Sequence, residues 1–415
     1  MREMKDSGIE WIGEIPADWT ITKIGALYSL RNEKVSDRDY EPLSVTKQGI
    51  LPQLETAAKT NAHDDRKLVK KGDFVINSRS DRRGSCGIAP MNGSVSLINI
   101  VLKPNDEMNP GYYDWLYHTT EFADEFYKWG HGIVDDLWTT GWADMKKIQS
   151  VVPPVSEQQQ ITAYLDCKCA EINSLLRDIQ TQIDTLEQYK RSVITEAVTK
   201  GLNPEAEMKD SGIQWVGEIP SHWKIHPVYT YFGERKNKNK FGLESNLLSL
   251  SYGKVVQKDI NTNEGLLPES FNTYNIVEPG DIIIRPTDLQ NDKRSLRTGL
   301  VTEHGIITSA YIDLCPIKRI DTRYFHYLLH AYDVMKVFYN MGNGVRQGLN
   351  YSEFSRLMVF EPTYEEQREI ADYLDGKVTE ADSVIADKKA QLETLEEYKK
   401  SLIFEYVTGK KEVPA

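Results

Sequence analysis

The sequence has 415 residues, of which 40% are hydrophobic and 27% charged, and its formal net charge is −12. A typical domain has roughly 150 residues, so more than one folding unit is expected. No stretch holds the 18 or more apolar residues of a membrane span, and the N-terminus has no apolar leader segment, which predicts a soluble, cytoplasmic protein that does not enter a membrane. Four cysteines are too few for a disulfide framework, and the C-x-C spacing of Cys167 and Cys169 does not match a structural zinc site.

The sequence is internally duplicated. Residues 4–19 and 208–223 are identical at twelve of sixteen positions. Further on, YLD at Tyr164 recurs at Tyr373, and LEQYKRS at Leu186 recurs as LEEYKKS at Leu395. A repeat of about 200 residues indicates two copies of a domain set, because solenoid repeats are roughly 20 to 50 residues long.

Each copy consists of a short aromatic segment, here called the strap (4–19 and 208–223), a variable body and a long helical segment. Body 1 (20–156) and body 2 (224–360) align poorly except at points such as Gly72-Asp73 and Gly280-Asp281. Constant ends around divergent middles indicate one scaffold with two different binding surfaces. We therefore predict four parts: a first domain with its strap (1–155), a first long helix (156–203), a second domain with its strap (204–361) and a second long helix (362–415).

Capping signals bound both helices. Ser156 with Gln159 reads as a capping box after a double proline, and Gly201 ends the first helix; Thr363 with Glu366 starts the second and Gly409 ends it. The second helix lacks the double proline, so we expect the chain to approach it at a different angle.

Apolar residues spaced three and four apart run along both helices, which predicts that each packs on another helix. The predicted packing residues are Leu165, Ile172, Leu176, Ile179, Ile183, Leu186, Leu374, Ile385, Leu392, Leu395 and Leu402. Two pairings satisfy this pattern: a coiled coil between two chains, or an antiparallel pair within one chain that spaces the bodies. We favour the second, because each stripe has an equivalent in the same chain.

The excess of acidic residues falls in the straps and helices, and the two bodies together are close to neutral. Local basic clusters must therefore supply any affinity for a polyanion. Two clusters follow the Gly-Asp points, at comparable places in the two bodies. The residues concerned are Arg79, Ser80, Arg82 and Arg83 in body 1, and Arg285, Gln290, Asn291, Lys293, Arg294 and Arg297 in body 2.

Arginine suits guanine edges, Asn and Gln suit adenine, and serine suits phosphate, so this composition fits a base-reading loop. A solvated surface loop is the competing interpretation, and recurrence in both bodies favours DNA contact. A third basic patch, with Arg235, Lys236 and Lys238, has phosphate-binding character or is a flexible turn. A Gly-x-Gly turn late in body 2 includes one further candidate, Asn343, and is followed by two more, Arg346 and Gln347.

The strap tryptophans Trp11, Trp19, Trp215 and Trp223 are either base-stacking platforms or anchors against an apolar surface; their identical contexts favour the anchors.

The sequence lacks the common motifs of an independent enzyme. The one Pro-Pro pair, Pro153-Pro154, lacks the polar and aromatic neighbours of an adenine methyltransferase loop, and there is no P-loop, zinc-protease motif or G-x-S-x-G elbow.

The ordered, duplicated motifs resemble the specificity subunit of type I restriction-modification systems. The strap pattern D-S-G-h-x-W-h-G-x-I-P-x-x-W covers Asp6–Trp19 and Asp210–Trp223, and the pattern P-x-x-x-E-Q-x-x-I-x-x-x-L opens the helices at Pro153–Leu165 and Pro362–Leu374. The resemblance covers essentially the whole chain. It implies an α+β (mixed α/β) fold, with two target recognition domains separated by two long antiparallel helices that form an intramolecular coiled coil.

The resemblance also implies partners and a division of labour. Each recognition domain would read one half of a split, asymmetric site in double-stranded DNA, with the gap set by the helices. Two modification subunits would bring S-adenosylmethionine and adenine methylation, and restriction subunits would bring ATP, Mg and cleavage. This chain would have no catalytic, cofactor-binding or metal-binding residues of its own. A two-headed protein-binding scaffold is the alternative function, and a self-sufficient enzyme binding S-adenosylmethionine or ATP is a third.

Overall fold

The computed structural model describes residues 2–54, 64–132, 138–260, 270–287, 289, 296–339, 341 and 348–414. The chain divides into two compact units, unit 1 (1–180 and 390–415) and unit 2 (181–389). This division differs from the four predicted parts, because each unit contains one body together with half of each long helix.

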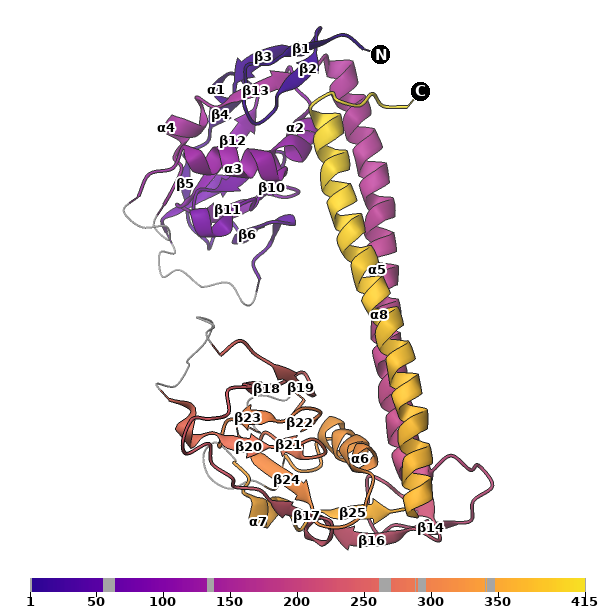
Figure 1. Cartoon of the computed structure of the whole chain (residues 1–415). Helices are drawn as coiled ribbons and strands as arrows, with labels where there is room; N and C mark the ends of the chain where they lie inside the picture. The colour runs from indigo at the N-terminus through magenta and orange to yellow at the C-terminus, as the bar shows by residue number, and fades with distance from the viewer. Residues whose placement is uncertain are drawn as a thin grey trace. The chain divides into compact units, whose positions relative to one another are not determined.

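Unit 1 contains body 1 and its strap (Figure 1). Its elements in chain order are β1 (Met4–Asp6), β2 (Glu14–Pro16), β3 (Thr20–Lys23), α1 (Ile24–Leu27), β4 (Tyr28–Leu30), β5 (Lys34–Val35), β6 (Leu43–Thr46), β7 (Gly49–Pro52), β8 (Arg66–Val69), β9 (Phe74–Asn77), η1 (Ser80–Arg82), β10 (Cys86–Ile88), β11 (Gly93–Ser96), β12 (Asn99–Pro104), α2 (Pro110–Tyr117), α3 (Thr120–Lys128), α4 (Trp142–Met145), β13 (Gln149–Val152) and the start of α5 (Val155–Lys200).

Unit 2 contains body 2 and its strap. Its elements are the end of α5, β14 (Met208–Asp210), β15 (Glu218–Pro220), β16 (Lys224–Pro227), η3 (Val228–Thr230), β17 (Phe232–Glu234), β18 (Leu248–Ser251), β19 (Lys254–Gln257), η4 (Phe271–Thr273), β20 (Asn275–Val277), β21 (Ile282–Ile284), β22 (Thr298–Leu300), β23 (Gly305–Ile307), β24 (Ile312–Pro316), α6 (Thr322–Val334), α7 (Tyr351–Phe354), β25 (Met358–Glu361) and the start of α8 (Tyr364–Val407).

The two bodies share one architecture although their sequences diverge. The four-stranded sheet of body 1 has the order β10-β9-β12-β4, and the sheet of body 2 has the corresponding order β22-β21-β24-β17. Each body also has an antiparallel two-stranded hairpin, β6–β7 or β18–β19, and a strand pair that brackets the whole body, β3–β13 or β16–β25. The internal duplication therefore extends through the bodies as a fold.

The strap sequence forms the same tight turn in both copies. In the first strap, the Asp6 carboxylate accepts a hydrogen bond from the Gly8 N–H at 2.9 Å, and the Ser7 hydroxyl accepts one from the Ile9 N–H at 3.1 Å. Asp210 and Ser211 make the equivalent bonds at 2.9 and 3.1 Å in the second strap. The D-S-G motif is therefore a turn-forming sequence whose side chains satisfy backbone donors.

Both long helices are present, with bounds close to those predicted. Helix α5 begins at Val155, so Ser156 lies inside its first turn and the predicted capping box there is wrong; Pro154 directly precedes the helix instead. Helix α8 begins at Tyr364, and the Thr363 hydroxyl accepts the Glu366 N–H at 3.3 Å, as its sequence predicted.

The two helices start alike, despite the missing second proline. The side-chain amide of Gln158 donates to the Pro153 carbonyl at 2.8 Å and accepts the Asn109 N–H at 2.9 Å. In copy two, Gln367 makes the same pair of bonds, to Pro362 at 3.0 Å and from Asp321 at 3.0 Å. The predicted difference in approach is therefore not observed at this contact, and the glutamine of the E-Q motif ties each helix start to its body.

Each body packs on the start of one long helix and the end of the other, and in each unit α5 and α8 run side by side in opposite directions (Figure 1). The core of unit 1 joins Leu165 of α5 to Leu402 and Val407 of α8. The core of unit 2 joins Val198 of α5 to Leu374 of α8. Antiparallel pairing inside one chain follows from these contacts, as the sequence predicted.

The predicted helical stripe faces inward along its length. Six of its members are buried: Leu165, Ile172, Ile183, Leu374, Ile385 and Leu402. The others, Leu176, Ile179, Leu186, Leu392 and Leu395, are half-buried. Polar contacts flank the stripe, with Lys399 donating to Asn173 at 2.8 Å in unit 1 and Lys190 pairing with Asp382 at 2.7 Å in unit 2.

The tryptophan that ends each strap anchors the adjoining long helix. Trp19 and Trp223 are fully buried, and each donates its indole N–H to a carboxylate in the first turn of the adjoining helix, Glu157 or Glu366, at 2.9 Å. Trp11 and Trp215 are half-buried and pack edge-on against Phe122 and Tyr332. The positions of these four side chains fit the anchor role expected of them.

Within the described ranges, no helix is long and apolar enough to cross a membrane.

The glycine after α8 gives a test of this packing. Gly409 has a left-handed backbone, with φ 71°, and a methyl group there would overlap Pro16 and Trp19. We expect Gly409→Ala to lower the free energy of unfolding by about 2 kcal/mol or more, because it adds backbone strain to overlap with the strap. Urea unfolding of the full chain measures this.

Gly376 is the matched control. It lies inside α8, and a methyl group there would have no atom within 4 Å. Gly376→Ala should raise stability by about 0.8 kcal/mol, because alanine favours a helix interior. Equal effects of the two substitutions would contradict the proposed packing of Gly409.

Candidate nucleic-acid interface

The Gly-Asp points shared by the two bodies are buried ion-pair turns. Asp73 accepts two hydrogen bonds from the Arg31 guanidinium, at 2.6 and 3.0 Å, and a third from the Lys70 N–H at 2.8 Å. The preceding Gly72 has φ 90°, which explains why glycine stands there. Asp73 itself is buried, so this pair fixes the start of β9 and does not offer a charge to a ligand.

Body 2 repeats this turn with Asp281 and Arg235. The guanidinium donates at 2.8 and 3.1 Å to the carboxylate, which also accepts the Glu278 N–H at 2.9 Å. Arg235, a predicted DNA contact, has the framework role of Arg31 in this structure, with 30% of its side chain exposed. The two remaining candidates of that patch differ in exposure: Lys236 is exposed and pairs with Glu234, and Lys238 is half-buried and donates to the Thr273 carbonyl.

The basic cluster of body 1 forms a surface loop around η1. Arg79 pairs with Asp81 at 3.0 Å, and Arg83 pairs with Asp124 at 2.9 Å while its guanidinium lies 3.7 Å from the centroid of the Tyr127 ring. Arg82 has the most exposed side chain of the three, at 66%. Half-buried Ser80 donates its backbone N–H to the Trp138 carbonyl, which ties the loop to the segment after α3.

The corresponding cluster of body 2 is only partly described. Gln290, Asn291, Lys293 and Arg294, and likewise Asn343, Arg346 and Gln347, lie outside the described residues. Arg285 is half-buried next to β21.

Arg297 is fully buried, and the prediction that it contacts DNA is wrong. Its Nε donates to the Tyr339 hydroxyl at 3.0 Å, its Nη1 donates to the Thr287 carbonyl, and its backbone N–H donates to the buried carboxylate of Asp333. A short run of basic residues reveals composition and not burial, which is why the sequence placed this arginine on the surface.

The hairpin tips are further candidates that the sequence did not reveal. The hairpins lie at the end of each body opposite its strap, as Figure 1 shows for β6 and for β18 and β19. Their framework strands read LSVT and LSLS, and their exposed tips differ: Lys47 and Gln48 in body 1, Tyr252 in body 2. Equivalent strands with different tips are what two distinct binding surfaces on one scaffold require.

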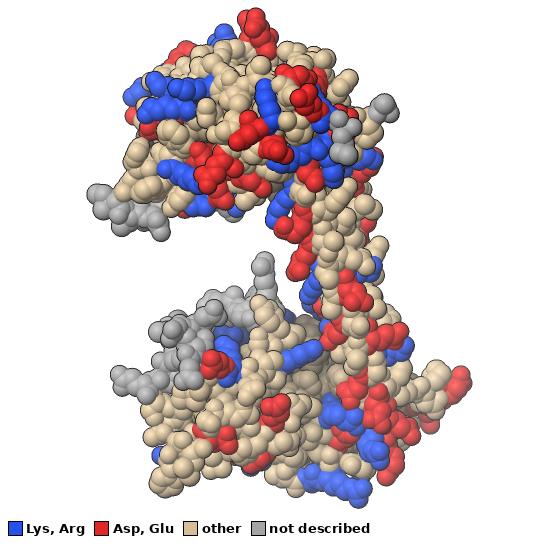
Figure 2. Space-filling model, turned by 45° about the horizontal axis from the view of Figure 1, so that its top comes forward, with Lys and Arg blue, Asp and Glu red and all other residues tan. Residues whose placement is uncertain are grey.

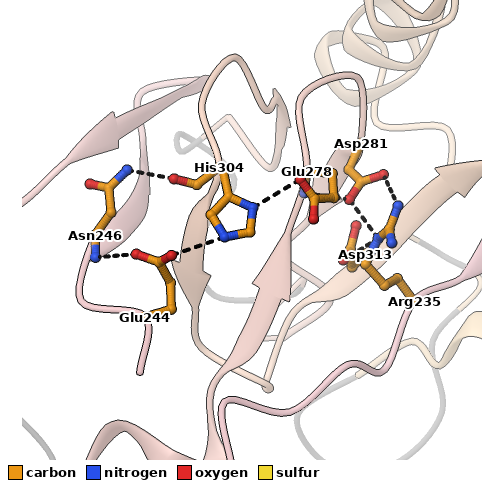
Figure 3. Close-up of polar contacts among 7 residues, drawn as sticks. All are labelled: Arg235, Glu244, Asn246, Glu278, Asp281, His304 and Asp313. Carbon is orange, nitrogen blue, oxygen red and sulfur yellow. Dashed lines mark hydrogen bonds and ion pairs between the residues drawn. The ribbon is translucent and has the colours of Figure 1, made fainter. Parts of the chain in front are cut away.

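A polar network stiffens body 2 beside this hairpin. Figure 3 shows His304 between two carboxylates, with Nε2 at 2.9 Å from Glu244 and Nδ1 at 2.9 Å from Glu278. The bond to Glu278 raises the pKa of His304, and the backbone N–H of Asn246 lowers the pKa of Glu244. The network therefore ties the chain leading into β18 to the turn that precedes Asp281.

Asp313 is a buried carboxyl in the same view (Figure 3). Its nearest cation is Arg235 at 3.8 Å, and neither of its oxygens has a hydrogen-bond partner among the described residues. Burial, with a contribution from Asp281, raises its pKa to about 8. In body 1 the equivalent strand position is Val101. Val101 lies opposite Val75 in its sheet, just as Asp313 lies opposite Ile283. The shared fold therefore does not require a carboxyl at this position.

Charge on the visible face is mixed. Figure 2 shows basic and acidic side chains interspersed over both bodies, without one continuous basic surface on this face. Among the described residues, no group of three or more His, Cys, Asp or Glu side chains is placed to hold a metal ion. The exposed basic side chains of the two bodies are therefore separate contacts rather than one basic surface.

Substituting Arg235 tests its assignment to the framework. Arg235→Ala would leave the buried carboxylate of Asp281, and the Asp313 carboxyl beside it, without their guanidinium, and we expect a loss of about 3 kcal/mol in stability. Hydrogen exchange within β21 and β24 would report it locally. Lys236→Ala is the control, since an exposed lysine should change stability by less than about 0.5 kcal/mol. An unchanged exchange rate in Arg235→Ala would contradict the framework role.

The raised pKa of Asp313 predicts a pH dependence. Between the unfolded value of 3.8 and the folded value of about 8, folding takes up a proton at this carboxyl. The contribution of Asp313 to the free energy of unfolding therefore falls as pH rises through that window and stays constant above it. Asp313→Asn should remove that contribution, which urea unfolding at pH 5 and pH 8 would show; the same pH difference in both proteins would be the contrary result.

Comparison with known proteins gives a consistent picture. No protein-family model matches the chain. The putative type I restriction enzyme MjaX specificity subunit of Methanocaldococcus jannaschii is 24% identical over 436 residues, which cover 96% of this chain and 95% of that protein. The MjaVIII specificity subunit of the same organism is 22% identical over 426 residues, covering 95% and 93%.

Solved structures show the same fold. A chain from a structure of the assembly and conformational transition of a type I restriction-modification system matches with a TM-score of 0.70 at 12% identity, covering 96% of this chain and 99% of that one. The HsdS subunit from Thermoanaerobacter tengcongensis matches with a TM-score of 0.51 at 14% identity, covering 96% and 98%. Over nearly its whole length, this chain is therefore similar to the specificity subunits of type I restriction enzymes, the family that its straps and helix starts resemble.

Proposed function

We propose that the chain is the DNA-recognition subunit of a type I restriction-modification complex. Each body reads one half of a split, asymmetric site in double-stranded DNA. The observation that carries this proposal is the pairing of one framework with two sets of exposed residues: both bodies have the same sheet order and the same Arg–Asp turn, yet their hairpin tips and surface loops differ. The full-length similarity to specificity subunits supports it.

The chemistry is assigned to other subunits. In this proposal the chain is not catalytic, acts in the cytoplasm and docks two modification subunits that bind S-adenosylmethionine and methylate adenine. Restriction subunits join through the complex and supply ATP- and Mg-dependent cleavage. In body 1 the exposed Arg79, Arg82 and Arg83, with Ser80, are the proposed DNA contacts. Among the described residues of body 2 they are Lys236, Lys238 and Arg285, and the candidates of body 2 outside the described residues remain part of the proposal.

Binding to duplex DNA tests the proposal directly. The chain assembled with its modification subunits should bind a duplex carrying its site, with an affinity that falls steeply with salt because phosphate contacts release counterions. Methylome sequencing of a host carrying both genes identifies the site first. Binding to a partner protein with no site-specific methylation would favour the two-headed scaffold instead.

The helices are proposed to set the unread gap. Seven residues preserve the helical stripe and add about 10.5 Å at 1.5 Å per residue. Inserting seven residues at facing points of α5 and α8 should lengthen the gap by no more than about three base pairs, at 3.4 Å per base pair, and leave both half-sites unchanged. Methylome sequencing reads gap and half-sites together, and an altered half-site with an unaltered gap would refute the spacer role.

A further inference from the structure

The tip of the β18–β19 hairpin holds an aromatic side chain almost entirely in solvent. Tyr252 is 90% exposed, and among the described residues only Phe241 and Leu243 are large apolar side chains of similar exposure. A tyrosine normally buries most of its ring, because the ring is largely apolar. Single exposed apolar side chains are common on protein surfaces, so the backbone conformation of this tip is the more informative observation.

The backbone at this tip is unfavourable for tyrosine. Tyr252 has φ 47° and Gly253 has φ 79°, so both central residues of the two-residue turn are left-handed. Such turns favour Asn-Gly or Asp-Gly, because short polar side chains tolerate this conformation and bulky ones do not. Tyrosine here is costly for folding, and with 90% of the residue exposed there is little packing against the described residues to offset that cost.

The hairpin is mounted firmly on the rest of body 2. Its strands pair from Leu248 opposite Gln257 to Ser251 opposite Lys254, next to the tip. Lys254 then pairs with Asp382 of α8 at 2.9 Å, and the same carboxylate binds Lys190. Gly253 is buried against Leu296. The strand pairing and these contacts therefore hold the hairpin that carries Tyr252 in place on body 2.

The equivalent hairpin of body 1 ends differently. Its exposed tip residues are Lys47 and Gln48, and the left-handed position is taken by Gly49 with φ 101°. This tip has neither an aromatic ring nor a strained bulky residue. The feature is therefore specific to body 2 and is not required by the shared fold.

We propose that Tyr252 is a wedge that stacks on a base of the half-site read by body 2 and partly unstacks one base step. This inference rests on the proposed DNA-recognition function. A two-stranded ribbon fits the major groove, and an aromatic ring stacks on any base. A single ring on a narrow ribbon offers little of the roughly 800 Å² per partner that a stable protein interface buries, which favours DNA over a protein.

The test uses the full chain assembled with its modification subunits, bound to the duplex found by methylome sequencing. Tyr252→Asn installs the residue that the turn prefers, so the melting temperature of the chain should stay the same or rise. Affinity for the site should fall about tenfold or more, because a stacking contact is lost. Tyr252→Phe keeps the ring and should retain the affinity of the wild type.

A fluorescent base reports the wedge itself. With 2-aminopurine placed in turn along the half-site of body 2, the wild-type complex and Tyr252→Phe should raise the fluorescence at one step, and Tyr252→Asn should not. Gln48→Asn, at the tip of the body 1 hairpin, is the matched control and should leave that signal unchanged.

The outcomes separate this inference from the function on which it rests. If the wild-type complex binds no specific duplex, the proposed function fails. If it binds its site and Tyr252→Asn keeps both affinity and fluorescence, the wedge is refuted and the function stands. If Tyr252→Asn instead weakens assembly with the modification subunits, the ring contacts protein and the wedge is likewise refuted.

Discussion

The indole–carboxylate contact between strap and helix is the constraint on which the rest of the fold depends. Trp19 and Trp223 are both fully buried, and both donate to a glutamate in the first turn of a long helix, Glu157 or Glu366. A buried N–H must find an acceptor, so the tryptophan fixes where each helix begins relative to its body. The far end of the other helix is held as well: the Tyr112 hydroxyl donates to the Val407 carbonyl at 2.6 Å in unit 1. Each body is thus built around one helix start and one helix end, and neither helix can slide without disrupting two cores.

This anchoring allows the rest of each body to diverge. The Arg31–Asp73 and Arg235–Asp281 turns hold corresponding strand ends in place, while most other residues differ between the two bodies. Asp313 illustrates that freedom, because body 1 has a valine at the same place, whereas body 2 has a carboxyl whose pKa is raised to about 8 by burial. Fixed turns with variable tips are a physical means of changing a binding surface without changing a fold.

Some of this could be predicted from the sequence and some could not. The helices and their inward stripe were predictable because apolar spacing is local information, and the duplication was visible as repeated letters. Sheet order was not, since strand partners are distant in sequence and the bodies have diverged. The Arg235–Asp281 pair spans 46 residues, so local composition did not reveal it, and composition placed Arg297 on the surface because charge patterns do not reveal burial. Tyr252 was missed because Tyr-Gly is not a common hairpin sequence, so its turn appears only in the backbone angles.

Under the proposed function, the same ion pairs would limit how this chain binds a polyanion. Arg31 and Arg235 are committed to buried carboxylates, Arg297 lies in the core, and Arg79 and Arg83 each have an acidic neighbour. Nonspecific attraction needs many uncompensated cations, and the bodies, close to neutral in sequence, do not supply them. Under the proposed function, weak nonspecific attraction would favour selectivity, because the few exposed contacts at the loops and hairpin tips would then decide which DNA sequence is bound. Much of the general affinity would then come from its partners, which would make site choice and attachment to DNA separable properties of the assembled complex.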